Sequence, residues 1–231
     1  MRRFRILPVA LVLLFLSALA RADAKFLTKD DVDATIALLS PPPADGSPEQ
    51  QAEIATLLDL QKNRTPQDVA RAERNSHLDG FLFAGVLGDW FNAKDLPLTA
   101  KLMTDVGHEA GAVDSLAKDK FQRNRPFVGE PRLHPTLQAA GYSYPSGHAT
   151  AGMTYALILA EMFPEHRDAL IAKGKQVGED REVAGVHYPS DVVGGQKIAA
   201  EIAKRLLANT EFHAEMEKTI DEVHADASAP K

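Results

Sequence analysis

Apolar side chains recur at the three- and four-residue spacing of a helix along most of this chain, and the alternation typical of strands is almost absent. Helices are predicted from Glu49 onward, from Thr65 through Arg74 towards Phe83, and over residues 96–121, 146–163, 165–178 and 189–207. Residues past His213 are predicted to form a polar helix that frays, whereas the breakers in residues 23–50, 85–94 and 123–141 indicate irregular segments. Without strands to form a sheet, the chain is predicted to be an all-α, single-domain helical bundle.

The N-terminus has the pattern of a secretory signal peptide. A basic start, Met1–Arg5, is followed by an apolar run over residues 6–20 and by the small residues Ala20 and Ala22. This run is shorter than the ~20 residues that a membrane-spanning helix needs. We therefore expect cleavage after Ala22, export to the periplasm with secretion as an alternative, and a mature domain over residues 23–231 with its core over about 50–210.

Composition narrows the range of partners. Removal of residues 1–22 takes away four arginines and no acid, so the net charge changes from −6 to −10. An acidic chain is a poor partner for nucleic acid and for an anionic membrane surface. The chain contains no cysteine, so packing alone must stabilise it after export. No later segment is apolar enough to be predicted as a membrane span.

Candidate chemistry begins with two cations near the end of the helix predicted over residues 96–121. Lys118 and Arg125 lie seven residues apart, close to two helical turns, so both can project from one face. An arginine can bind two phosphate oxygens with its fork, and a lysine adds a point charge. The alternative is a solvated helix end, where cations offset the helix dipole.

A second motif, Pro145-Ser146-Gly147-His148, stands where a helix is predicted to begin. Ser146 can cap that helix, and Gly147 lets the backbone approach a ligand closely. Unpaired N–H groups at such a helix start suit an anion. A plain N-cap explains Ser146 equally well, and a nucleophilic serine is disfavoured because the G-x-S-x-G pattern is missing.

A third motif combines Arg181, His187 and Asp191. The histidine and the carboxylate are four residues apart and can hydrogen-bond on one face of a helical turn. That bond would fix the tautomer and leave the other ring nitrogen free as a nucleophile. One alternative is an ordinary helix start. Another is a zinc site with His134 or His166, which the missing H-E-x-x-H pattern and the surrounding cations disfavour.

In this order the three motifs resemble the signature of the type 2 phosphatidic-acid phosphatase superfamily. That family includes the bacterial class A non-specific acid phosphatases and is related to the vanadium haloperoxidases. The exported format of about 25.1 kDa is similar to the class A branch. The resemblance implies the helical bundle of that family and no metal or other cofactor. One position departs from it, because Asp180 stands where the family usually has serine. An acid beside Arg181 would either weaken oxyanion binding or position the guanidinium.

The resemblance also implies a role for each matching residue. His187 attacks phosphorus to form a phosphohistidine, Asp191 orients it, and His148 protonates the leaving alcohol and then activates water. The phosphate oxygens are held by Lys118, Arg125, Ser146, Gly147 and Arg181. Because His187 must be neutral and His148 protonated, with ordinary pKa values near ~6.5, a bell-shaped pH profile with an acidic optimum is expected.

We therefore expect an acid phosphatase that hydrolyses small phosphate monoesters of broad specificity without a metal ion. The alternatives are a lipid-phosphate or diphosphate phosphatase, which the missing membrane spans disfavour, a vanadate-dependent haloperoxidase, and an inactive phosphate-binding protein on the same scaffold. The sequence leaves open the physiological substrate, phosphotransferase activity, the oligomeric state (a homo-oligomer included), the effect of Asp180 and the role of residues 213–231.

Overall fold

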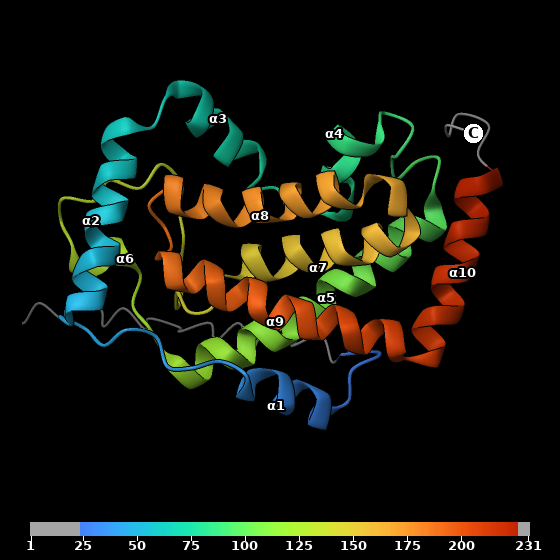
Figure 1. Ribbon diagram of the computed structural model, residues 1–231, viewed down its shortest axis with the longest axis horizontal. Coiled ribbons are helices and arrows are strands. Elements are labelled where there is room, and N and C mark those ends of the chain that lie inside the picture. Colours follow the sequence, from blue (N-terminus) through green and yellow to red (C-terminus); the bar gives the residue numbers. More distant parts are fainter. Residues whose placement is uncertain (1–23, 226–231) are drawn as a thin grey trace, which may run out of the picture.

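The computed structural model describes residues 24–225, and all regular structure in this part of the chain is helical (Figure 1). The predicted signal peptide and the last six residues lie outside the described residues. The prediction of an all-α fold is confirmed. The elements are α1 (Lys29–Ala37), α2 (Pro48–Asn63), α3 (Pro66–Arg74), the 3₁₀ turn η1 (Gly80–Phe83), α4 (Ala84–Leu87), α5 (Pro97–Phe121), α6 (Pro126–Gly129), α7 (Gly147–Met162), the 3₁₀ turn η2 (Pro164–His166), α8 (Arg167–Val183), α9 (Pro189–Ala208) and α10 (Thr210–Ala225).

Helix α7 forms the centre of the bundle, packed against α5, α8 and α9 (Figure 1). Buried residues cover most of its surface, as expected for a helix that is apolar on every side. It approaches α8 closely because both helices carry glycine at the contact. A Cβ atom on Gly174 would lie 2.6 Å from the Ala156 Cβ, and one on Gly152 would lie 2.8 Å from a methyl of Val177. Alanine at either position would force the two helices apart.

The remaining helices cover the sides and ends of this centre. Helix α1 lies along α5 and α9, α10 crosses one end of the bundle, and α2 and α3 cover the opposite end (Figure 1). At the α2–α3 end, the C-terminal ends of α5 and α8 meet the N-terminal ends of α7 and α9 (Figure 1). The motifs noted in the sequence all lie at or beside these four helix ends.

Three parts of the secondary-structure prediction were wrong. Residues 23–50 contain α1, which a reciprocal capping box between Thr28 and Asp31 begins. Helix α3 ends at Arg74 instead of continuing towards Phe83, and the next residues form short turns. Helix α8 continues to Val183, five residues beyond the predicted end, so Arg181 lies on a helix and not in a loop. None of the helices within residues 24–225 is both long and apolar enough to cross a membrane.

Candidate active site

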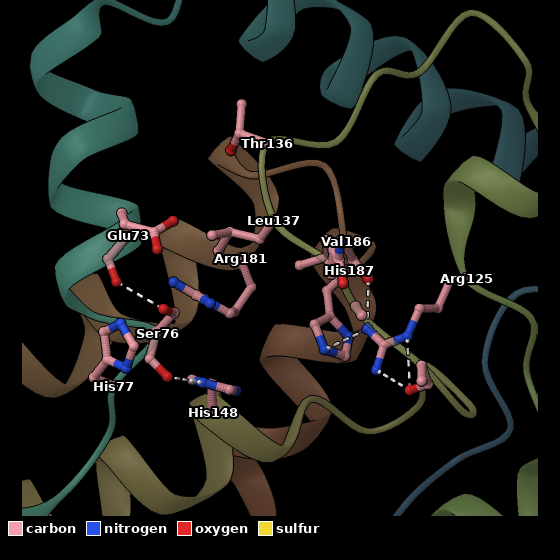
Figure 2. Close-up of a pocket in the computed structure, with 13 residues that line it drawn as sticks. Glu73, Ser76, His77, Arg125, Thr136, Leu137, His148, Arg181, Val186 and His187 are labelled. Carbon is pink, nitrogen blue, oxygen red and sulfur yellow. Dashed lines mark hydrogen bonds between the residues drawn. The ribbon is translucent and has the colours of Figure 1, made fainter.

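A cleft of about 610 Å³ opens at the α2–α3 end of the bundle (Figure 2). Four of the residues predicted from the sequence line it: Arg125, His148, Arg181 and His187. The rest of its wall comes from the end of α3 with the turn after it, over residues 73–77, from the loop over residues 136–140, and from Val186 beside His187. The structure therefore brings cations and histidines from all three motifs to one cavity.

His187 lies just before α9 and is held at both ring nitrogens. Its Nδ1 is 3.2 Å from Asp191 Oδ2, and its Nε2 is 3.1 Å from the Arg125 guanidinium. A guanidinium can only donate, so Nε2 is the unprotonated acceptor and Nδ1–H donates to the carboxylate. Burial lowers the pKa of His187 to about 4, although Asp191 opposes that shift. The imidazole is therefore neutral, and its Nε2 lone pair accepts the Arg125 N–H in a ring that lines the cleft.

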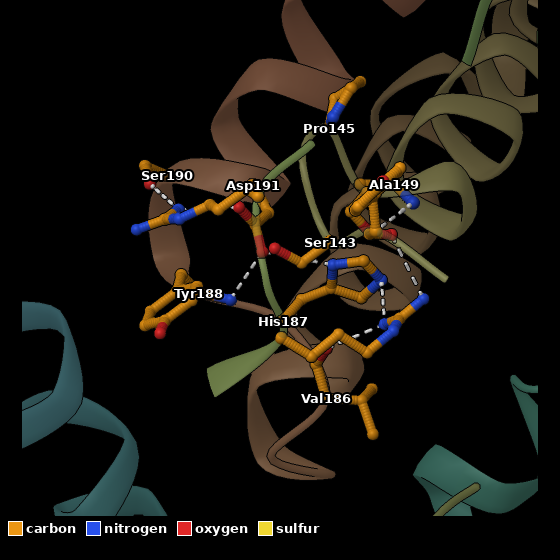
Figure 3. Close-up of polar contacts among 12 residues, drawn as sticks. Ser143, Pro145, Ala149, Val186, His187, Tyr188, Ser190 and Asp191 are labelled. Atoms are coloured by element: carbon orange, nitrogen blue, oxygen red, sulfur yellow. Dashed lines mark hydrogen bonds and ion pairs between the residues drawn. The ribbon is translucent and has the colours of Figure 1, made fainter. Parts of the chain in front are cut away.

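Asp191 is fully buried at the third position of α9 and serves two purposes. Its Oδ2 accepts the Tyr188 backbone N–H at 2.9 Å, which caps the helix, while it also accepts the His187 Nδ1–H (Figure 3). Although burial opposes ionisation, these hydrogen bonds and the charge of Arg123 hold the pKa of Asp191 below its ordinary value. Asp191 therefore makes both the helix-capping contact of an ordinary helix start and the contact with His187 that the predicted orienter requires.

Arg123 is a residue of this site that sequence reasoning missed. It donates to Asp191 Oδ1 at 2.7 Å and to Glu53 Oε2 at 2.6 Å, and its guanidinium stacks 3.7 Å from the Tyr188 ring centroid. It also donates to the Ser190 hydroxyl at 2.7 Å. Only 3 % of its side chain is exposed. Arg123 thus balances the buried charge of Asp191 from the side opposite His187.

Arg125 is held by the backbone of two loops. Its guanidinium donates to the carbonyls of Ala140 and Val186, at 2.9 Å and 2.8 Å, in addition to its contact with His187. Burial lowers its pKa below the ordinary value, but an arginine remains charged at any pH at which the protein is folded. These contacts place a fixed positive charge beside the candidate nucleophile.

Arg181 projects into the cleft from the last turn of α8 (Figure 2). One terminal nitrogen donates to the Ala72 carbonyl at 2.5 Å, but the buried Nε has no hydrogen-bond partner among residues 24–225. Burial lowers its pKa to about 10, although Asp180 and Glu73 oppose the shift. An unpaired donor on a buried cation in a cleft is what an anion would satisfy.

His148 lies on the first turn of α7 and faces the turn after α3. Its Nε2 lies 3.1 Å from the Ser76 carbonyl oxygen (Figure 2). Burial lowers its pKa to about 4, the charge of Arg181 adds to that shift, and the Ser76 carbonyl opposes it. His148 and His187 are therefore both neutral near pH 7 in the absence of an anion.

Besides Asp191, three further predicted residues, Lys118, Ser146 and Gly147, do not line the cleft. Lys118 Nζ pairs with the buried Asp114 at 2.6 Å and donates to the Pro145 carbonyl at 2.5 Å, so it joins α5 to the second motif. Ser146 is the N-cap of α7 and accepts the Ala149 N–H at 3.4 Å. A Cβ atom on Gly147 would lie 2.9 Å from Asp114 Oδ2. That glycine is needed for close packing of α7 on α5, a reason the sequence did not reveal.

The comparisons with known proteins agree with this geometry. Residues 106–211 match the family model of the PAP2 superfamily. The chain is 32% identical over 219 residues to a non-specific acid phosphatase of Providencia stuartii, across 87% of this chain and 86% of that protein. The chain belongs to the PAP2 superfamily. An acid phosphatase of Zymomonas mobilis is 32% identical over 205 residues, or 83% of this PAP2 chain and 77% of that protein.

A solved structure is similar in fold. A bacterial vanadium-dependent iodoperoxidase superposes with a TM-score of 0.57 at 15% identity, over 74% of this PAP2 protein and 52% of that chain. At this identity the likeness concerns the fold alone, and it confirms the predicted bundle type.

One detail of the motif geometry was predicted wrongly. Helix α5 of this PAP2 protein ends at Phe121, where Gln122 adopts a left-handed φ of 49°, so Lys118 and Arg125 do not share a helix face. Helix α9 begins at Pro189, as predicted, and the expected hydrogen bond joins its Asp191 to His187, which stands just before the helix.

Asp180, the residue that departs from the family signature, is fully buried and does not line the cleft. Its two oxygens accept from Arg71 Nε at 2.9 Å and from Asn75 Nδ2 at 2.5 Å, both on or just after α3. It therefore does not occupy the oxyanion-binding side of Arg181. Among residues 24–225 no group of three or more histidine, aspartate and glutamate side chains is arranged to hold a metal ion.

Proposed function

We propose that this PAP2 protein is an exported, non-specific acid phosphatase that hydrolyses phosphate monoesters through a phosphohistidine on His187. The observation that carries the proposal is the state of that ring. Its Nδ1–H is fixed on a buried carboxylate, and its unprotonated Nε2 lies in a cleft beside two buried guanidinium groups. A neutral, oriented imidazole next to an anion site is a nucleophile for phosphorus.

In the first half of the reaction, Nε2 of His187 forms a bond to phosphorus while the ester P–O bond breaks. His148, protonated, transfers its proton to the oxygen of the departing alcohol. The positive charge that develops on His187 is balanced by Asp191, which Arg123 keeps ionised. In the second half, His148 removes a proton from water, the water oxygen bonds to phosphorus, and the P–N bond breaks to release inorganic phosphate.

Fixed positive charge supports the transition state. The phosphoryl oxygens carry the charge in such a reaction, and preorganised donors stabilise it without reorganisation. Arg125 and Arg181 line the cleft, while Lys118 lies behind it and orients the Pro145 carbonyl at the start of α7. The N-terminal end of α7 adds the partial positive charge of its dipole.

The named relatives support this activity, since the proteins of Providencia stuartii and Zymomonas mobilis are both called acid phosphatases. The deciding experiment measures release of p-nitrophenol from p-nitrophenyl phosphate by residues 23–231, with and without EDTA. We expect turnover that EDTA leaves unchanged. Absence of turnover, or strict dependence on added metal, would refute the proposal, and a strong preference for phosphatidate would favour the lipid-phosphate alternative.

The phosphohistidine has its own test. The reaction is started with an ester whose phosphate is labelled and is then quenched rapidly. We expect protein-bound labelled phosphate that is labile in acid and stable in base with the wild type, and none with His187→Ala. Label that survives in His187→Ala would remove the nucleophile assignment while leaving the phosphatase activity standing.

Export rests on the sequence pattern of residues 1–22 alone. Expression of the full chain in a bacterial host should give a periplasmic product that begins at Asp23. An intact N-terminus in the cytoplasmic fraction would refute this part of the proposal.

A further inference from the structure

We propose that Asp180 is a positioning residue for the acid–base histidine, His148. Its carboxylate ties the end of α3 to α8, and that end of α3 supplies the carbonyl that binds the His148 ring. The inference rests on the proposed phosphatase function, since it concerns the proton that His148 gives to the leaving alcohol. It also gives a physical role to the one residue that departs from the family signature.

The connection between the two helices is centred on the buried carboxylate of Asp180, both oxygens of which accept hydrogen bonds from residues in or just after α3. Asp180 is 0 % exposed, and its two oxygens accept from Arg71 Nε and Asn75 Nδ2. Asn75 is itself 1 % exposed, and its Oδ1 accepts from Lys173 Nζ at 2.9 Å. The asparagine is therefore held in one orientation by two charged groups of α8.

A second contact joins the same two helices at the same place. Arg181 donates to the Ala72 carbonyl at 2.5 Å, one helical turn before Asn75. Helix α3 has only nine residues and buries only Ala72, so it has little apolar packing of its own. Short helices are marginal without tertiary contacts, and here buried polar contacts supply them.

Ser76, the residue after Asn75, contacts the proposed acid–base histidine. The Ser76 carbonyl accepts from His148 Nε2 at 3.1 Å, and Figure 2 shows Ser76 on one side of the His148 ring and His187 on the other. A carbonyl can only accept, so Nε2 keeps its proton in both states of the ring. Nδ1 is then the nitrogen that gains and loses the catalytic proton. The position of the Ser76 carbonyl therefore determines which tautomer His148 adopts and how its ring is oriented in the cleft.

The amide and the carboxylate at position 180 are not equivalent in this network. In Asp180→Asn, the NH₂ group of the new amide must face either the Arg71 guanidinium or the Asn75 NH₂ group. Either arrangement places two hydrogen-bond donors against each other. Rotation of Asn75 would avoid the second clash, but it would place an NH₂ group against Lys173. One contact is lost in every arrangement, although the side chain keeps its size.

The experiment compares two substrates whose leaving groups need different amounts of help. An alkyl phosphate expels a basic alkoxide and depends on a proton donor, whereas p-nitrophenyl phosphate expels a stabilised phenolate. The ratio of kcat/KM for the two reports proton donation in the step that breaks the ester bond. For Asp180→Asn we expect kcat/KM for the alkyl phosphate to fall about tenfold or more, with a loss of less than about threefold for p-nitrophenyl phosphate.

Two further variants separate positioning from general destabilisation. Arg71→Gln removes the other side of the tie at a side chain that is 30 % exposed, so it keeps the test open if Asp180→Asn folds poorly. The matched control is Asp68→Asn, which removes the second carboxylate partner of Arg71, 2.7 Å away, without touching α8. We expect the selective loss in Arg71→Gln and not in Asp68→Asn, with thermal midpoints measured for all three.

Each result decides between the proposals. Equal losses on both substrates in Asp180→Asn and Arg71→Gln, or a selective loss in Asp68→Asn as large as theirs, would overturn the positioning role. A wild type that hydrolyses neither substrate would overturn the proposed function, and this inference with it. An active wild type whose variants behave like the control would overturn the inference alone.

Discussion

The replacement Arg123→Met tests whether a buried ion pair outside the cleft controls the nucleophile. The side chain of Arg123 is 3 % exposed, and those of its partners Asp191 and Glu53 are 0 % and 12 % exposed. Methionine has a similar length but no charge, so both carboxylates would lose their charged donor. Asp191 would keep the Tyr188 N–H and the His187 ring, and Glu53 would keep the Ser190 N–H at 2.7 Å.

These residual contacts set the expected magnitude. Removal of one partner from a buried pair costs about 3–5 kcal/mol when the other charge is left uncompensated. Because each carboxylate keeps a neutral donor, we expect a loss near the lower end, about 3 kcal/mol of unfolding free energy. For a domain of this size that corresponds to a fall of about 6–12 °C in Tm. The pKa of Asp191 should also rise, because a cation that lowers it is gone.

Activity should fall by more than the loss of folded protein explains. A protonated or displaced Asp191 no longer orients His187, and misplacement of a reacting group by about 1 Å can reduce the rate about 10²-fold. We therefore expect kcat/KM for p-nitrophenyl phosphate to fall about 10²-fold, measured at a temperature at which circular dichroism shows the variant to be folded.

The control is Arg205→Met, on the last turns of α9. Arg205 also pairs with two carboxylates, Asp31 and Glu201, but neither is hydrogen-bonded to a residue of the cleft, as Asp191 is to His187. This variant should lose stability and keep its kcat/KM. The reasoning would be refuted if Arg123→Met kept its kcat/KM within about twofold while folded, or if Arg205→Met lost activity equally.

Two further predictions concern the anion site and the pH profile. Arg181→Gln removes a charged donor whose Nε is unpaired, so we expect the inhibition constant of inorganic phosphate to rise about 10- to 100-fold. Its Tm should fall modestly, because the Ala72 carbonyl loses its donor. Lys118→Met should lower Tm further, because it leaves the buried Asp114 without its cation, and a Tm no lower than that of Arg181→Gln would contradict this. The proposed reaction needs His187 neutral and His148 protonated, and the pKa of each is lowered to about 4. The optimum of kcat/KM should therefore lie well below pH ~6.5, the ordinary pKa of histidine. At pH values above the optimum, kcat/KM should fall as His148 loses its proton. Bound phosphate offsets the cations that help lower the His148 pKa, so the upper limb of the kcat profile should lie at higher pH than that of kcat/KM, and coincident limbs would count against the assignment.

The helices that carry the site were predictable because their patterns are long. Helices α5, α7 and α9 were expected within a few residues of their observed ends. Helix α1 was not, although Thr28 followed by Asp31 three residues later is a capping-box pattern that could have revealed it. Its apolar stripe is short, and the prolines that follow it made the whole segment look irregular.

The chemistry of the site was predictable only as far as residue type and order carry it. From the order of the motifs, Arg125, His148, Arg181 and His187 were predicted to form one site, and all four line the same cleft. They did not show that Lys118 faces Asp114 and Pro145, behind the cleft wall. Residue spacing describes a helix face well, but α5 ends at Phe121, as predicted, so a spacing that crosses this end could not place Arg125 relative to Lys118.

The residues that hold the reacting groups in place escaped prediction for a different reason. Arg123 lies in a run of charged residues that looks like a solvated helix end, and locally nothing distinguishes it from Lys120. It differs only because Glu53, some 70 residues earlier in the chain, and Asp191, 68 residues later, meet it in the folded protein. A candidate nucleophile can be recognised from its residue type and motif, but the cation that balances its carboxylate can come from any element that packs nearby. The role of Asp180 was equally hard to predict. Its neighbour Arg181 belongs to the signature, but its own partners, Arg71 and Asn75, lie in and just after the short helix α3. The reaction therefore constrains the groups that touch phosphate, whereas the packing of each chain determines which residues keep those groups charged and correctly oriented.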